Sequence, residues 1–508
     1  MQSVWREGTT ARSIHKKVIG IIAAVSFLMG TGVFTTIRGD ALYMESENTT
    51  SARIIWWICP VGEYSDEEKV EELVDTFEKA HPQIEVDYRI LDEQTGVDEI
   101  DTAFAENNAP DVVMAAPEDI VTKWGAEGHM ADLSQLWDEK TQSEFRPEMR
   151  DLSRNREGTW YAVPLFRDLY TMAINYNIFK KAGVLQYLSV DTHSWKDSGF
   201  IDAVLRVHDV LVQEGSEAGI VGKVYCKDQN GQRAFMSFVS NFFNTGLVDD
   251  YRSSYQVGSS EITNVFTTLR KLGGKGIEFD PEMDGDDENE AFLNGDLFLT
   301  FNWSASKQHV AGSDAQVPVE SFDGQLSDIN PAEELYVGTN EEPEEELVEE
   351  IEEDSSGLRI LPMMYPNSKN TPSLTGPVRA LGVVETEDEK KKNAAMSFVQ
   401  FLMSDEDAYR QAVLTAGCFP ARRSINGHEL TGLYGDDEVM NLYETLNEYY
   451  EYYDPTMELY PQLEEAWPEL LREIGEGAKI KSITGSLEKD LNKKLEDEYG
   501  IKKIDMEE

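Results

Sequence analysis

The sequence predicts an α/β protein of two lobes that are connected by extended segments. Strand and helix patterns alternate between about residues 53 and 116 and again between about 169 and 303, and residues 158–183 join the two blocks. Alternation of this kind is typical of a mostly parallel sheet that is covered by helices. A chain of 508 residues is also long enough to bury two cores.

The first block begins with residues 53–59 (RIIWWIC), a nearly continuous apolar run that is typical of a buried parallel strand. Ser65 and Glu68 have the spacing of a capping box, which predicts that a helix begins there. Residues 84–90 alternate as a second strand, and residues 111–116 are expected to form a third. These elements predict the first α/β lobe.

The joining segment, residues 158–183, predicts a strand that ends at Pro164 and a second strand over 169–174. Arg167 and Asp168 lie between the two strands. A polar crossing between two strands is typical of a hinge between lobes, and ligands of two-lobed α/β proteins lie beside such crossings.

The second block and the C-terminal part continue the alternation. Helices are expected over 200–212, 232–243 and 260–272, and strands over 220–226, 297–303, 358–364 and 378–385. Thr386 and Glu389 have capping-box spacing before a helix that extends to Met403. The tail from about residue 436 is expected to be helical.

The predicted domain organisation follows from these patterns. It comprises a signal peptide or anchor at 1–38, a linker at 39–52, an N-lobe at 53–165 with 358–404, a C-lobe at 166–310 with 405–508, and an acidic insertion at 311–357. No Lys or Arg lies between Lys307 and Arg359, and such an acidic run is typical of a solvated loop or a loose helix. Calcium binding or partner docking is the alternative for this run.

The first residues have the pattern of a targeting segment. Basic residues precede an uncharged stretch from Val18 to Ile37, which Arg38 ends. The stretch is long for a cleaved signal and just long enough to span a bilayer, so both a cleaved signal and an N-terminal anchor remain open. Either one places the bulk of the chain outside the cytoplasm.

The formal net charge of -51 excludes some classes of partner. A surface this negative repels phosphate, which argues against nucleic acid, and it disfavours anionic lipid. The charge is expected mainly to maintain solubility.

The sequence predicts neither a metal site nor a cofactor. Cys59, Cys226 and Cys418 lie far apart and next to apolar residues, so buried thiols are expected. The seven histidines do not pair at metal-ligand spacing. Residues 280–291 resemble an EF-hand loop but place Ala291 at the twelfth position, where a bidentate Glu is needed.

Sequence motifs of catalysis are also missing. The chain has no phosphate-binding G-x-x-x-x-G-K-[ST] loop and no G-x-S-x-G elbow. A glycoside hydrolase needs only two carboxylates, which no motif excludes, but acidic residues are so abundant here that pairs are expected by chance. The prediction is therefore a protein that is not an enzyme.

Aromatic and charged residues at the ends of strands are the candidate ligand residues. In open α/β sheets, ligands bind beyond the carboxyl ends of strands, and an aromatic face with nearby carboxylates suits a sugar ring. For each aromatic residue, packing in the core is the alternative. The candidates found in this way are Glu63, Glu118, Trp160, Arg167, Asp168, Tyr170 and Trp303.

Several short motifs, in order and spacing, resemble the maltose-binding-protein-like class of extracellular solute-binding proteins, the receptors of ABC sugar importers. The resemblance covers about residues 53–474 and rests on these stretches: 80–82 (AHP), 109–113 (APDVV), 161–164 (YAVP), 174–179 (INYNIF), 291–295 (AFLNG) before Trp303, 394–403 and 417–422.

The resemblance implies a periplasmic-binding-protein-like fold of type II, with two lobes joined by three crossings that close over a carbohydrate. By position, Asp168 matches a sugar-binding acid, Glu118 an acid after the third strand, and Trp303 a stacking aromatic. Glu63 and Tyr64 fall in the first ligand loop, and Arg379 lies where relatives place another ligand residue. These residues complete the candidate set.

This chain departs from the family pattern in three places. Ala115 stands where maltose-binding protein has an aromatic residue, which disfavours a maltodextrin ligand. The acidic segment is an insertion at the second crossing, and the Cys that carries lipid in many relatives is missing. The function expected from the resemblance is a monomeric receptor that delivers sugar to ABC permease subunits, and a ligand-presenting sensor or a secreted glycoside hydrolase are the alternatives.

Overall fold

The computed structural model describes residues 51–93, 95–189, 193–227, 232–244, 246–249, 253–312, 358–368, 373–447 and 459–499. The predicted targeting segment lies outside the described residues. So does the predicted acidic insertion at 311–357, except for its first two residues, 311 and 312. No helix in the described part of the chain is long and apolar enough to cross a membrane.

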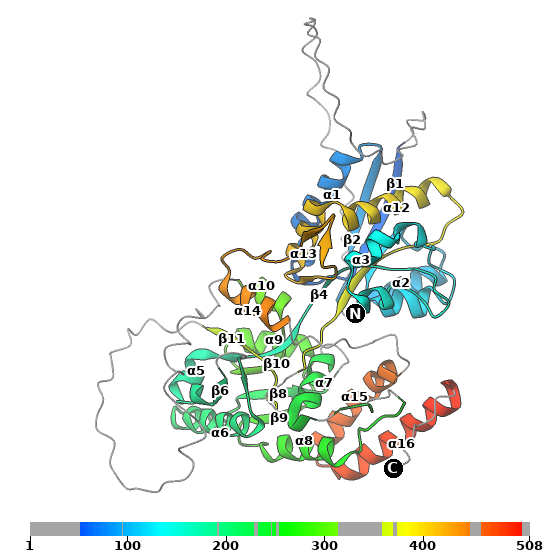
Figure 1. The fold of residues 1–508 in the computed structure, drawn as a ribbon. Coiled ribbons are helices and arrows are strands. Elements are labelled where there is room, and N and C mark those ends of the chain that lie inside the picture. Colours follow the sequence, from blue (N-terminus) through cyan, green and yellow to red (C-terminus); the bar gives the residue numbers. More distant parts are fainter. Residues whose placement is uncertain are drawn as a thin grey trace, which may run out of the picture. The chain divides into compact units, whose positions relative to one another are not determined.

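The described chain is built around two main sheets (Figure 1). The first has the strand order β13-β4-β12-β3-β1-β2. Its strands are β1 (Ala52–Ile58), β2 (Ile84–Ile90), β3 (Val112–Ala115), β4 (Val163–Arg167), β12 (Val378–Val383) and β13 (Phe419–Pro420). β1 pairs in parallel with β2 and β3, whereas β12 is antiparallel to β3 and β4. We call the part of the chain around this sheet the first lobe.

Helices cover both faces of this sheet. The long helices are α1 (Glu67–Ala80), α2 (Gly96–Ala105), α12 (Glu389–Ser404) and α13 (Glu406–Ala416). Buried side chains of α1, α12 and α13 share one apolar core with β1, whereas α2 and the π-helix η2 (Asp119–Trp124) belong to a second core. Short helices η1 (Gly62–Ser65), η3 (Ser134–Leu136), α3 (Glu139–Glu144) and α4 (Pro147–Leu152) complete this lobe. The result is a layered α/β arrangement, as the strand and helix patterns predict.

The second main sheet has three antiparallel strands in the order β10-β5-β11, namely β5 (Tyr170–Asn175), β10 (Leu299–Ser304) and β11 (Ile360–Met363). A parallel pair, β8 (Gly222–Tyr225) and β9 (Ile277–Asp280), continues from it through the bond from the main-chain nitrogen of Phe298 to the carbonyl oxygen of Val221. We call the part of the chain around these strands the second lobe.

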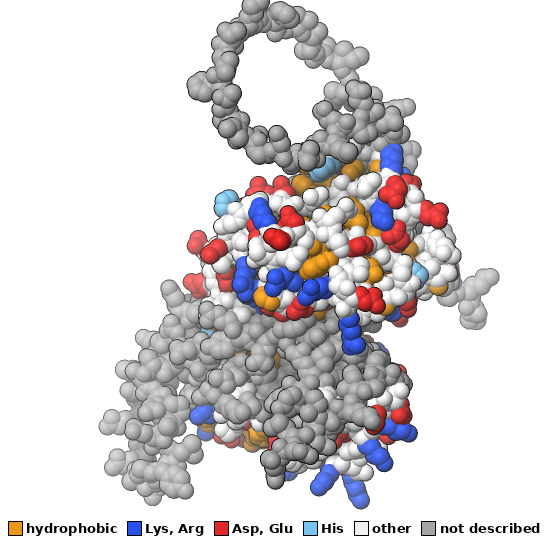
Figure 2. Space-filling model, turned by 45° about the vertical axis from the view of Figure 1, so that its right-hand side comes forward, with side chains coloured by type: hydrophobic (Ala, Val, Ile, Leu, Met, Phe, Trp, Pro, Cys, Tyr) orange, Lys and Arg blue, Asp and Glu red, His pale blue; other side chains and the backbone are white. Residues whose placement is uncertain are grey.

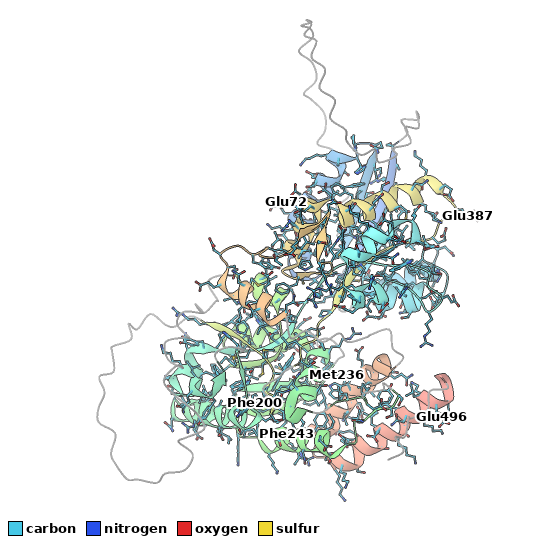
Figure 3. All side chains as sticks on the ribbon, viewed as in Figure 1. Glu72, Phe200, Met236, Phe243, Glu387 and Glu496 are labelled. Atoms are coloured by element: carbon cyan, nitrogen blue, oxygen red, sulfur yellow. The ribbon has the colours of Figure 1, made fainter. Side chains whose placement is uncertain are left out.

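The helices of the second lobe enclose the largest apolar core. They are α5 (Tyr176–Lys181), α6 (Asp197–Gln213), α7 (Gln232–Asn241), α8 (Ser260–Lys271), α9 (Gly285–Leu293), α10 (Ala305–Ala311), α14 (Glu438–Leu446), α15 (Leu459–Gly475) and α16 (Ile480–Tyr499). Phe200 and Met236 are buried in this core, and Phe243 packs against it (Figure 3). The remaining short elements are η4 (Leu185–Tyr187), β6 (Leu188–Ser189), β7 (Ser194–Trp195), η5 (Phe242–Asn244), β14 (Ser424–Ile425) and β15 (His428–Glu429).

Two of the crossings between the sheets run side by side. One leads from β4 to β5, and the other leads from β11 to β12. The main-chain nitrogen of Asp168 donates to the carbonyl oxygen of Pro377 at 2.9 Å, and that of Tyr170 donates to Thr375 at 2.8 Å. A third connection leaves β13 and reaches α14, whose Tyr443 hydroxyl lies 2.9 Å from the hydroxyl of Thr171.

Three local predictions are wrong. β4 does not end at Pro164 but passes through it to Arg167, because Pro164 lies at a register shift of the β12–β4 pairing and the crossing itself is at Asp168 and Leu169. Helix α1 is capped by Asp66 and not by Ser65, and α12 is capped by Asp388 and not by Thr386. In both helices an Asp carboxylate accepts the orphan main-chain N–H groups, a strong N-cap interaction.

Sheet membership also differs from the predicted lobe ranges. β11 belongs to the three-stranded sheet, although residues 358–404 were assigned to the N-lobe. α13 and β13 pack in the first lobe, although residues 405–508 were assigned to the C-lobe. We therefore propose that the chain passes between lobes at residues 373–377 and again within 421–437.

The environment of the cysteines agrees with the sequence prediction of buried thiols. All three cysteines are buried and unbridged, and burial raises the pKa of Cys59 to about 11. Acidic and basic side chains are interspersed on the described surface of the first lobe (Figure 2).

Candidate functional site

Glu118 lies three residues beyond β3, past the carboxyl end of a central strand of the first sheet. Its Oε1 accepts from Nη1 of Arg233 at 2.6 Å, and Arg233 in α7 belongs to the second lobe. Nε and Nη2 of Arg233 donate to the two carboxylate oxygens of Glu464 in α15, at 2.5 and 3.1 Å. One guanidinium therefore joins two carboxylates from separate elements, at the place where open α/β sheets bind ligands.

Asp119 lies beside this cluster. Burial, followed by the neighbouring Glu118 carboxylate, raises the pKa of Asp119 to about 7, and Lys123, Arg233 and Arg379 oppose the shift. The Asp119 carboxyl is therefore partly protonated near neutral pH and can donate as well as accept a hydrogen bond.

Arg379 and Tyr170 approach the same cluster from the two crossings. The register of β12 against β4 shifts between Arg379 and Ala380, and a bulge of this kind redirects side chains. Nε of Arg379 is buried and has no hydrogen-bond partner among the described residues. Burial raises the pKa of the Tyr170 hydroxyl, whereas Arg233 and Arg379 lower it slightly. Of the predicted ligand residues, the structure therefore brings together Glu118, Tyr170 and Arg379.

The carboxylate of Asp168 hydrogen-bonds within the protein, to Leu169 and Ser306, and not to the Glu118 cluster. It is 3% exposed, and its carboxylate accepts from the main-chain nitrogens of Leu169 and Ser306 and from the Ser306 hydroxyl, at 2.7, 3.2 and 2.5 Å. Burial raises its pKa, and these bonds oppose the shift. Asp168 thus ties the first crossing to α10, and its neighbour Arg167 is buried within β4.

The predicted aromatic ligand residues are packed in cores. Trp303 is 1% exposed, its Nε1 donates to Gln308 at 3.0 Å, and its ring meets Phe292 edge-on. Trp160 stacks on Trp137 at 4.3 Å, and Tyr64 is fully buried against Phe166. Stacking on a sugar needs an accessible ring face, which these three buried rings do not offer. The alternative considered for each aromatic residue, packing in the core, therefore fits all three.

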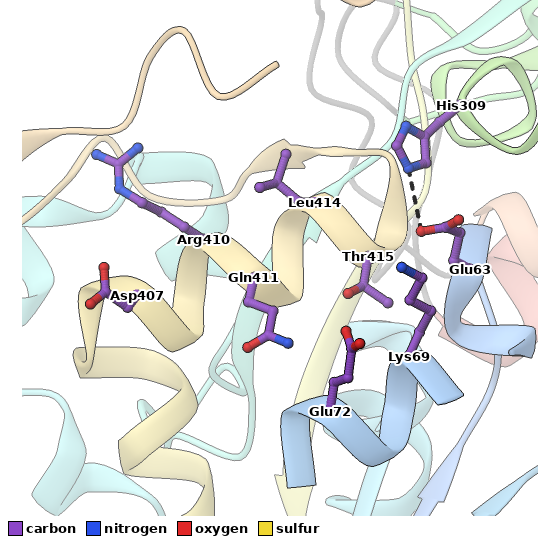
Figure 4. Close-up of a pocket in the computed structure, with 9 residues that line it drawn as sticks. All are labelled: Glu63, Lys69, Glu72, His309, Asp407, Arg410, Gln411, Leu414 and Thr415. Atoms are coloured by element: carbon purple, nitrogen blue, oxygen red, sulfur yellow. Dashed lines mark ion pairs between the residues drawn. The ribbon is translucent and has the colours of Figure 1, made fainter. Parts of the chain in front are cut away.

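Glu63 lines a separate groove of about 380 Å³ between α1 and α13 (Figure 4). Its carboxylate lies 3.6 Å from Nε2 of His309 in α10. The other lining residues are Lys69, Glu72, Asp407, Arg410, Gln411, Leu414 and Thr415, none of which belongs to the Glu118 cluster.

Arg233 and Glu464 were missed by the sequence reasoning. In α7, Arg233, Ser237 and Asn241 are spaced four residues apart along an otherwise largely apolar helix. That spacing puts three polar groups on one stripe, which was a usable signal for a face directed at a polar site. Glu464 has no comparable signal, because acidic residues are common throughout the tail.

The described residues contain no group of His, Cys, Asp and Glu side chains that could hold a metal ion. The Glu118 cluster instead offers carboxylate acceptors, guanidinium donors, a carboxyl of intermediate pKa and a phenol hydroxyl. Such a set can make hydrogen bonds to a polyhydroxylated molecule.

Comparison with known proteins supplies the context of this site. A sequence profile described as bacterial extracellular solute-binding protein matches residues 72–431. A comparison with curated proteins gives no match.

Among solved structures, the GacH receptor of Streptomyces glaucescens, determined unliganded and with acarbose, is similar at 16% identity and a TM-score of 0.63. The alignment covers 88% of this chain and 98% of GacH. The substrate-binding protein Lmo0181 of Listeria monocytogenes, in complex with cycloalternan, gives 14% identity, 88% and 99% coverage and a TM-score of 0.63. Maltose-bound MalE3 of T. maritima is similar at 16% identity and a TM-score of 0.62, and the alignment covers 87% of this chain and 99% of MalE3. These similarities show the two-lobed binding-protein fold.

Proposed function

Because this chain belongs to the bacterial extracellular solute-binding proteins, a family of binding proteins and not of enzymes, we propose that it is an extracytoplasmic carbohydrate receptor. The observation that carries the proposal is the cluster of Glu118, Asp119, Arg233 and Arg379 beside the two adjacent crossings. Structurally similar proteins have been determined with acarbose, cycloalternan and maltose, which supports a carbohydrate ligand.

The proposed ligand contacts are Glu118, Tyr170 and Arg379, with Asp119 as a further hydrogen-bonding group. Carboxylates accept hydrogen bonds from sugar hydroxyls, and the unpartnered Nε of Arg379 can donate to a sugar oxygen. Contacts from both lobes favour the closed arrangement, because a ligand shifts a conformational equilibrium by its difference in affinity for the two states.

A thermal-shift screen tests the binding function. The panel is maltose, maltotriose, acarbose, cycloalternan and α-D-tagatose, with glycerophosphocholine as a ligand of different chemistry. A ligand at 100 times its Kd stabilises the folded state by about 2.7 kcal/mol and raises Tm. Absence of any shift with a wider set of carbohydrates would contradict the proposal.

Site variants then test the assignment. We expect Glu118→Gln and Arg379→Gln each to weaken binding of the active carbohydrate by about tenfold, the loss of one charge-assisted hydrogen bond. Glu385→Gln is the matched control, because Glu385 pairs with Lys392 away from the cluster. Equal affinities for all three variants would overturn the site.

Delivery to ABC permease subunits and a monomeric state complete the proposal, and the N-terminal segment is either a cleaved signal or a membrane anchor. A polypeptide mass that includes residues 1–38, recovered with the membrane fraction, would support an anchor, whereas a shorter mass in the medium would support cleavage. Light scattering checks the monomer. Adjacent permease genes would support delivery, and an adjacent histidine kinase gene would instead support a sensor.

A further inference from the structure

Arg233 links groups that belong to different lobes. Its guanidinium donates to Glu118 of the first lobe and to Glu464 of the second, and the side chains of the three residues are 29%, 12% and 15% exposed, respectively. Because these side chains are partly exposed, salt still screens the ion pairs, although less than it screens pairs on the open surface.

Helix α7 also holds the second crossing. The hydroxyl of Ser237 lies 2.5 Å from that of Thr375, and the side chain of Asn241 bonds to both the main-chain oxygen and the main-chain nitrogen of Ser373, at 2.7 and 2.8 Å. Arg233, Ser237 and Asn241 thus form one stripe, whose first member reaches Glu118 and whose other members hold residues 373–375. The ion pair with Glu118 therefore connects a ligand residue to a hinge segment through a single rigid helix.

We propose that Arg233 is a positioning residue whose ion pair with Glu118 holds the two lobes together and competes with the ligand for that carboxylate. The competition with a carbohydrate rests on the function proposed above, whereas the holding of the lobes does not. Oε1 of Glu118 accepts from the guanidinium, so a sugar hydroxyl that replaces this bond must first open the ion pair.

The competition has a measurable consequence. When only a fraction of the protein is competent to bind, the apparent Kd is the intrinsic Kd divided by that fraction. Salt weakens ion pairs, so a higher salt concentration increases the competent fraction and strengthens carbohydrate binding. An ordinary charged ligand contact behaves in the opposite way, because salt weakens it.

The first experiment needs no ligand. Small-angle scattering of the whole ligand-free chain is recorded at 20 mM and 500 mM NaCl for the parent protein, Arg233→Gln and Arg472→Gln. Arg472 is the matched control, since it lies on α15 and its guanidinium pairs with Glu469 of the same helix and with Glu476 just after it. We expect the radius of gyration to rise with salt in the parent and the control, and to be high and insensitive to salt in Arg233→Gln. Equal values for all three proteins at both salt concentrations would overturn the holding role.

The second experiment is calorimetric titration with each panel carbohydrate that shifts Tm, at the same two salt concentrations. The parent is expected to bind about two- to fivefold more tightly at high salt, the range that corresponds to a partly exposed ion pair. Arg233→Gln is expected to bind tightly at both concentrations, and Arg233→Lys, which retains the charge, to recover part of the salt effect.

The outcomes separate the two proposals. Weaker binding by Arg233→Gln at both salt concentrations would make Arg233 a direct ligand contact and overturn the competition. A salt effect on the scattering without any carbohydrate binding would leave the holding role standing and contradict the carbohydrate function.

Discussion

Asp168 and Ser306 are joined by two hydrogen bonds, from the main-chain nitrogen and from the hydroxyl of Ser306, although the residues are 138 positions apart. Ser306 lies in the first turn of α10, so the carboxylate also faces the positive end of that helix. A residue expected from the sequence to bind sugar instead connects the first crossing to α10.

Asp168→Ala is therefore expected to lower the free energy of unfolding by about 1–3 kcal/mol, because buried donors lose their acceptor. Asp168→Asn should cost less, since an amide oxygen still accepts a hydrogen bond. The control is Asp132→Ala, because exposed Asp132 makes the same pair of bonds to Ser134 in contact with water. Urea unfolding measures both variants. A loss no greater than that of the control would contradict a structural role for Asp168.

Gly376 lies at a close approach of the two adjacent crossings. A Cβ on Gly376 would lie 2.1 Å from the carbonyl oxygen of Asp168. Gly376→Ala must therefore push the two segments apart, and we expect a loss of more than about 2 kcal/mol, the lower range for forced overpacking and strain. Gly485→Ala in α16 is the control: its Cβ would meet nothing within 4 Å, and Ala favours a helix by about 1 kcal/mol over Gly.

Trp303→Ala is expected to cost about 3–5 kcal/mol, because it removes a fully buried ring from a packed core. Trp57→Ala is the comparison, since Trp57 is only partly buried at the edge of its core. Thermal or urea unfolding distinguishes the two. If Trp303→Ala kept its stability and lost carbohydrate binding, the core assignment of this ring would be wrong.

Glu288 provides a pH test. It is fully buried, accepts from the Thr300 hydroxyl and the Phe301 nitrogen, and burial raises its pKa to about 7, with Lys307 opposing the shift. The folded state therefore binds the proton more tightly than the unfolded state. The stability that this provides is complete below pH about 4.5 and is lost as the pH rises through about 7.

We expect the free energy of unfolding of the parent to fall between pH 5 and pH 8, and Glu288→Gln to reduce that fall by about 2–3 kcal/mol. Asp119 titrates in the same range and direction, so part of the slope remains in the variant. Glu290→Gln, on the exposed side of the same helix, is the control. Identical slopes for parent and Glu288→Gln would show that Glu288 is not protonated on folding.

Much of the fold was accessible from the sequence because its signals are local. The alternation in β2 reflects burial mainly on one face, which the strand encodes in its own residues. The continuous apolar run of β1 predicts burial on both faces, but Ile54, Trp56 and Ile58 are buried whereas Ile55 is 38% exposed. The caps of α1 and α12 were each misplaced by one or two positions, because a nearby Asp competes with Ser or Thr for the same N–H groups.

The residues of the candidate site were harder to predict from the sequence than the fold. Glu118, Tyr170 and Arg379 were predicted as ligand residues, and the structure brings them near one another; their contact with a ligand remains a prediction. Trp303 and Asp168 stand at strand ends just as Glu118 does, and nothing in their neighbours along the chain indicates that packing encloses them.

The sequence by itself determined the two α/β blocks, the polar crossing after β4 and the family to which the chain is similar, because periodicity and short motifs are properties of neighbouring residues. Only the tertiary structure decided which polar side chains are available. Arg233 meets Glu118 across 115 positions of chain, and Ser306 meets Asp168 across 138. Those pairings depend on how separate elements pack: the spacing in α7 indicates a polar face, but the sequence does not say which distant residue each side chain meets.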